Sequence, residues 1–129
     1  MSTIQRFEDL EIWQLTREIA KEIYQLTRKD PFRKDYSLVN QIRNFSGSAM
    51  DNIAERFERD NNKEFRYFLS VSKGSAGEAR SQLYRALDQS YITRKEFNTE
   101  YEKLLELSRK IKSFMSYLSS SGYKGQRFK

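Results

Sequence analysis

Two short stripes of polar residues carry the side chains that are best suited to metal binding or proton transfer. Their members recur at steps of three and four, which places each stripe on one face of a helix. They are Ser48, Asn52 and Glu55 in the first stripe and Ser75, Glu78 and Gln82 in the second. A pair of carboxylates such as Glu55 and Glu78 could bind a metal ion or exchange protons with a substrate.

The composition argues against either reaction. The chain has no histidine and no cysteine, which removes the usual general base, the commonest metal ligand and the thiolate nucleophile. Ser-His-Asp triads and the Glu-x-x-His pairs of di-iron bundles are therefore excluded. We expect no catalytic site, no metal and no cofactor, and we interpret the stripes as a hydrogen-bonded network that fixes helix register or a subunit contact.

Small residues beside these stripes form two belts. One is Ser46-Gly47-Ser48-Ala49 and the other is Lys73-Gly74-Ser75-Ala76-Gly77, and a chain that folds back near residue 61 would place them opposite each other. Glycine inside a helix costs about 0.5 to 1 kcal/mol relative to alanine, so the two belts need a reason. We favour a close crossing of two helices. The alternative is a ligand or another subunit that approaches the backbone there.

Cations outnumber acids, at 24 Lys and Arg against 18 Asp and Glu, and give a net charge of +6. Such a surplus favours anionic partners such as RNA or DNA. The candidate nucleic-acid-binding residues form two groups: Arg28, Lys29, Arg33 and Lys34, and then Tyr123, Lys124, Arg127, Phe128 and Lys129. Their cations would contact phosphates and their rings would stack on exposed bases. The charges of the first group could equally serve solubility alone.

Four amphipathic helices must position these residues. The first should end before Pro31, because the residue preceding a proline disfavours the helical conformation, and the second should begin at about Tyr36. Helix-opening signals for the other boundaries are Asp9 for the first helix, Asn61 with Glu64 for the third, and Thr93 with Glu96 for the fourth. Because the connections are short, we predict an all-α, antiparallel up-and-down four-helix bundle over residues 1–119 and a flexible basic tail over 120–129.

Apolar residues at helical spacing predict which faces form the core. The predicted stripes are Ile12, Leu15, Ile19, Ile23 and Leu26; Leu38, Ile42, Phe45, Ala49, Ile53 and Phe57; Phe65, Phe68, Ser72, Ala76, Ala79, Leu83 and Ala86; and Phe97, Tyr101, Leu104, Ser108, Ile111, Met115 and Leu118. There is no signal-length apolar segment and no run of about 18 apolar residues. We therefore expect a cytoplasmic protein without membrane attachment.

The same residues carry a resemblance to a known family. The segments are Phe7-Glu-Asp-Leu-Glu-Ile-Trp13, Gln41-Ile-Arg43, Ser48 with Asn52-Ile-Ala-Glu55, Glu64-Phe65 with Phe68-Leu69, and Gly74-Ser75 with Glu78 and Gln82-Leu83. Over residues 7 to about 118 this ordered set resembles the four-helix-bundle proteins of intervening sequences in bacterial large-subunit ribosomal RNA genes. The resemblance implies a bacterial or phage origin and a ring-shaped homopentamer.

The resemblance also implies partners. The family includes the accessory variability determinant of diversity-generating retroelements, a pentamer that binds a reverse transcriptase and nucleic acid. Arg56 stands where most members have glycine, which leaves open how the second helix ends. It also adds a positive charge and a further candidate nucleic-acid contact, and with the basic tail it favours the retroelement branch. We predict a non-enzymatic, oligomeric accessory protein that binds RNA or DNA; the alternative is a protein-interaction scaffold with no direct nucleic-acid role.

Overall fold

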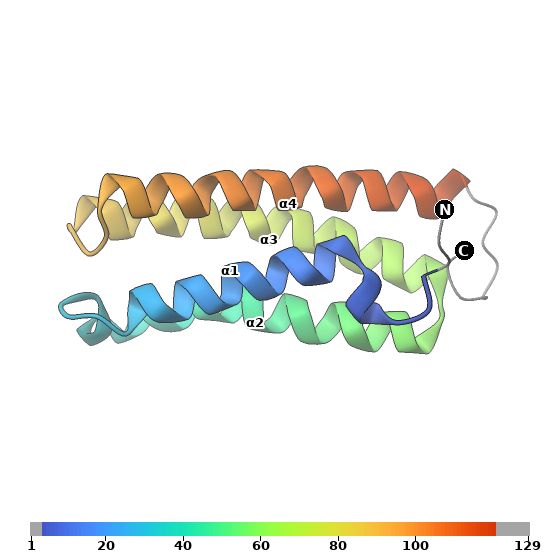
Figure 1. Ribbon diagram of the computed structural model, residues 1–129, viewed down its shortest axis with the longest axis horizontal. Coiled ribbons are helices and arrows are strands. Elements are labelled where there is room, and N and C mark those ends of the chain that lie inside the picture. The colour runs from blue at the N-terminus through green and yellow to red at the C-terminus, as the bar shows by residue number, and fades with distance from the viewer. Residues whose placement is uncertain (1–3, 121–129) are drawn as a thin grey trace.

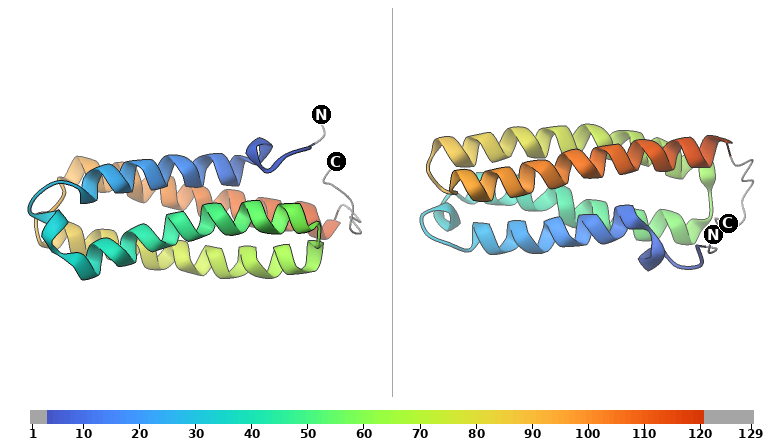
Figure 2. Two further views of the ribbon diagram at one scale, coloured as in Figure 1. Left: turned by 90° about the horizontal axis from the view of Figure 1, so that it is seen from below. Right: turned by 45° about the horizontal axis from the view of Figure 1, so that its top comes forward.

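Four long helices account for most of the chain. The computed structural model describes residues 4–120. The helices are α1 (Glu11–Thr27), α2 (Tyr36–Arg59), α3 (Asn62–Asp88) and α4 (Arg94–Ser120), and two 3-10 turns, η1 (Phe7–Asp9) and η2 (Phe32–Lys34), precede α1 and α2. Successive helices run antiparallel, and α1 and α3 each pack against both α2 and α4 (Figures 1 and 2). The predicted four-helix bundle is confirmed; a ring of subunits stays a prediction.

Side-chain caps fix where the later helices begin. The Asp35 carboxylate accepts a hydrogen bond from the Leu38 amide at 3.2 Å, and the Asn61 side-chain oxygen accepts one from the Glu64 amide at 3.0 Å. Thr93 and Glu96 form the predicted reciprocal capping box, with bonds of 3.0 and 2.9 Å. These bonds satisfy first-turn amides that have no partner within the helix.

The predicted cap of the first helix was wrong. Residue Leu10 occupies the N-cap position of α1, and the Asp9 carboxylate instead accepts hydrogen bonds from the amides of Gln5 and Arg6 at 3.2 and 3.1 Å. Asp9 therefore stabilises η1. Leu10 is 2% exposed, so burial of its side chain in the core fixes the turn between η1 and α1.

The core follows the predicted stripes with five exceptions. The exceptions are only partly buried; they are Phe45, Phe68, Tyr101, Ser108 and Met115. Leu69 and Leu107, which adjoin Phe68 and Ser108 in the sequence, are completely buried instead. Because α3 and α4 each pack against two other helices, each buries a wider arc than one stripe of residues covers. Within residues 4–120, no helix is both long enough and apolar enough to cross a membrane.

Candidate functional site

A groove between α2 and α3 contains most of the polar residues singled out in the sequence. It encloses about 550 Å³, and Ser48, Ser75, Glu78 and Gln82 line it. The side-chain oxygen Oε1 of Gln82 is buried and has no hydrogen-bond partner among residues 4–120. The polar residues of the two helices therefore meet across an open groove.

Apolar side chains also line the groove. Phe45 and Phe68 are partly buried along it, and Val71 is 49% exposed. Val71 lies off the predicted core stripe of α3. An apolar residue outside that stripe was the sequence signal that could have indicated this groove. The groove thus combines polar groups with apolar surface, a mixture typical of contacts between polypeptides.

The glycines do not mark a close helix crossing, which corrects the interpretation favoured from the sequence. A methyl group at Gly47 or Gly74 would have open space around it, with no atom of another element within 4 Å. Several small residues close to the glycines in the sequence are buried instead; they are Ser46, Ala49, Ser72 and Ala76. Within one subunit the packing of α2 against α3 does not require either glycine.

The remaining polar residues of the first stripe bond within α2. Asn52 Nδ2 donates to the backbone oxygen of Ser48 at 2.9 Å and to its hydroxyl at 3.2 Å. Glu55 forms an ion pair with Arg59 at 3.3 Å. Neither Asn52 nor Glu55 lines the groove. The groove therefore contains only part of the predicted polar network.

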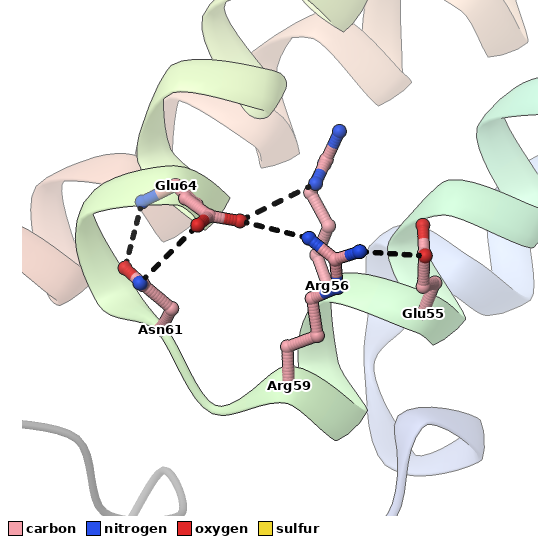
Figure 3. A network of polar contacts seen from close by, with 5 residues as sticks. All are labelled: Glu55, Arg56, Arg59, Asn61 and Glu64. Carbon is pink, nitrogen blue, oxygen red and sulfur yellow. Dashed lines mark hydrogen bonds and ion pairs between the residues drawn. The ribbon is translucent and has the colours of Figure 1, made fainter.

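Arg56 belongs to a cluster of charges at the turn between α2 and α3 (Figure 3). Its guanidinium lies 3.6 Å from the Glu64 carboxylate and 5.2 Å from the centre of the Phe68 ring. Arg59 contacts the same Glu64 oxygen at 3.2 Å. α2 continues through Arg56 to Arg59 and ends where Asp60 adopts a left-handed conformation, with φ of 61°. Arg56 therefore connects the two helices, and only 26% of its side chain is exposed.

The cations of residues 28–34 lie at the opposite end of the bundle from that turn (Figure 1). Lys29 lies 3.5 Å from Glu96, and Arg33 lies 3.0 Å from Asp30. The hydrogen bond from Arg33 lowers the pKa of the Asp30 carboxyl. Arg28 lies over the Tyr24 ring at 6.0 Å, and Lys34 is exposed.

The candidate binding residues therefore do not form one surface. Arg56 and residues 28–34 are separated by the length of the bundle (Figure 1). The tail residues, Tyr123, Lys124, Arg127, Phe128 and Lys129, lie outside the described residues. Their role and that of the other candidate cations stay predictions.

Sequence reasoning missed a buried carboxyl group between α1 and α4. Glu100 is 3% exposed, and its Oε1 has no hydrogen-bond partner in the part of the chain that the structure describes. Burial, followed by a hydrogen bond to the Glu22 carboxylate and the charge of that group, raises the pKa of Glu100 to about 9. The carboxyl is therefore protonated at neutral pH and donates to Glu22. The sequence did hold a signal, because Glu100 lies on the heptad stripe that includes Phe97, Leu104 and Leu107.

Lys103 neutralises the other carboxylates of this cluster. Its Nζ lies 2.6 Å from Glu22 and 3.0 Å from Glu18. Partial burial would lower the pKa of Lys103, but its hydrogen bonds to these two carboxylates raise it. Within residues 4–120, no group of three or more acidic, His or Cys side chains is arranged to hold a metal ion. The cluster joins α1 to α4 as a set of ion pairs around one neutral acid.

Comparison with known families identifies the chain. Residues 8–113 match the model of the 23S rRNA-intervening sequence protein family. The chain belongs to that family. The match covers all four helices, from before α1 to within α4, and it confirms the resemblance seen in the sequence. A comparison with curated proteins gives no match. The name of the 23S rRNA-intervening sequence protein family refers to ribosomal RNA, and the chain's link to RNA rests on that name.

Proposed function

We propose that this protein is a non-enzymatic, oligomeric accessory protein that holds RNA or DNA for a partner enzyme such as a reverse transcriptase. The observation that carries the proposal is the distribution of charge. Several acids are paired with cations of a neighbouring helix, as in Lys103 with Glu22 and Lys110 with Glu11. The net charge is nevertheless +6, so the surplus belongs to cations that attract phosphates.

The α2–α3 groove supports the oligomeric part of the proposal. Gln82 Oε1 has no partner within the described subunit, and Gly47 and Gly74 face open space. A second copy of the chain could approach these backbones closely and supply the missing hydrogen bond. In a closed ring, each subunit would add its own cations, so the affinity for a long polyanion would rise through effective concentration.

Two measurements test this function. Binding of labelled single-stranded RNA and DNA, followed by fluorescence anisotropy, should weaken steeply as salt increases, because bound phosphates release counterions. Light scattering should give the mass of a pentamer. Absence of salt-sensitive binding at low ionic strength would refute the nucleic-acid role, and a monomeric mass would refute the ring.

A protein-interaction scaffold is the second candidate, and Val71 and Phe45 in the groove favour it. In that case the positive charge is incidental. Substituting Arg33, Lys34 and the tail cations by Gln would then leave capture of the partner enzyme unchanged. Loss of capture on charge removal would favour the nucleic-acid role.

A further inference from the structure

A second groove, between α3 and α4, has a different chemical character. It consists of two hollows of about 530 and 350 Å³ that share Lys73 and Lys112. Arg66 lies in the first hollow, and Arg80 and Arg109 lie in the second. In the described part of the chain no acidic side chain lines either hollow, so the five cations face one channel along the bundle.

These cations are not neutralised by carboxylates. Among residues 4–120, no salt bridge within 4.0 Å involves Lys73, Arg109 or Lys112. Arg66 donates to two neutral groups, the side chains of Asn62 and Ser119, at 3.1 Å each. Arg80 lies 5.8 Å from the centre of the Tyr101 ring. The positive potential of the groove is therefore available to a ligand.

The spacing of the cations fits a chain of phosphates better than a single anion. Arg66, Lys73 and Arg80 recur every seven residues along α3, which is about 10 Å per step at 1.5 Å per residue. The row is thus about 20 Å long. Serine hydroxyls line the first hollow beside the cations and can donate to phosphate oxygens; they are those of Ser70, Ser116 and Ser119.

We infer that the α3–α4 groove holds the sugar-phosphate backbone of single-stranded RNA or DNA. The inference rests on the nucleic-acid-binding function proposed above and gives that function a site. Among residues 4–120 no aromatic side chain lines the groove. The described residues therefore offer backbone contacts rather than stacking platforms, and such contacts do not depend on sequence. The predicted basic tail follows directly in the sequence after α4.

A charge substitution with a matched control tests the site. For a single strand, log K falls with log salt with a slope of about −0.7 per neutralised phosphate. K73Q/K112Q should therefore make the slope shallower by about 1.4. If both proteins bind equally at 1 M salt, this change weakens binding about 25-fold at 0.1 M. K63Q/K95Q removes the same charge from two exposed lysines outside the groove and should leave the slope unchanged. K73R/K112R should bind as the wild type does.

The outcomes separate the site from the function. Equal losses in K73Q/K112Q and K63Q/K95Q would overturn the groove as a site while the nucleic-acid role stands. A wild-type protein that shows no salt-sensitive binding would overturn both. A K73Q/K112Q protein with an altered mass in solution and an unchanged slope would make this groove a subunit interface, which also overturns the inference.

Discussion

Replacing Glu100 by glutamine should remove most of the pH dependence of stability near neutrality. The Glu100 carboxyl is buried, 3% exposed, and holds its proton up to about pH 9, whereas a glutamate in the unfolded chain loses its proton near pH 4.5. Glutamine stays neutral at every pH, and its amide can donate to Glu22 as the protonated carboxyl does. The variant Glu100→Gln therefore keeps the hydrogen bond and removes the titration.

The sign and size follow from proton linkage. Below pH 4.5 both the folded and the unfolded state hold the proton, so Glu100 adds no slope. Between pH 4.5 and about 9 only the folded state holds it. The free energy of unfolding then falls as pH rises, by at most about 1.4 kcal/mol per pH unit. At pH 7, Glu100→Gln should be more stable than the wild type by about 3 kcal/mol.

Urea denaturation followed by far-UV circular dichroism measures this effect between pH 5.5 and 8.5. The chain has no histidine, so no side chain with an ordinary pKa titrates in that range and the slope reports on Glu100. Protein concentration is held constant because the proposed assembly would contribute to stability. Glu102→Gln, which removes an exposed carboxylate from the same helix, should keep the wild-type slope. Parallel curves for wild type and Glu100→Gln would refute the protonated carboxyl.

Three further substitutions test the α2–α3 region. Gly47→Ala and Gly74→Ala should each stabilise an isolated subunit by about 0.5 to 1 kcal/mol, because the new methyl group meets open space; thermal unfolding measures the gain. A lower mass by light scattering would place a neighbouring subunit at these glycines, and a loss of stability without a change of mass would contradict the packing. Arg56→Ala should destabilise the fold by about 1 kcal/mol through lost contacts with Glu64 and Phe68, and an unchanged denaturation midpoint would contradict that role.

Local sequence signals located most of the fold. The stripes at steps of three and four, the caps at Asn61 and Thr93, and the position of Pro31 gave four helices with nearly correct bounds. The error at Asp9 arose because a capping side chain accepts hydrogen bonds from whichever nearby backbone amides are unpaired. Here η1 offered them, and the burial of Leu10 decided the geometry.

The candidate site was harder to predict, because it depends on which helix faces come together. The glycines indicated a contact between α2 and α3, but only the packing of these helices shows that both glycines face outward. Similarly, Arg56 looked like a surface cation and instead lies against Phe68 and Glu64. A residue's position in the sequence does not specify the distance to a partner on another helix.

The helical fold, the absence of histidine and cysteine chemistry and the surplus of positive charge could all be predicted from the chain alone, because they depend on its periodicity and composition. Which of the charges are free depends on how the helices pack. Packing of α1 against α4 buries Glu100 beside Glu22 and pairs Lys103 with Glu22. Packing of α3 against α4 brings Lys73 and Lys112 together without an acid between them. Burial and distance between helices set the strength of charge interactions, and both arise only when the bundle closes.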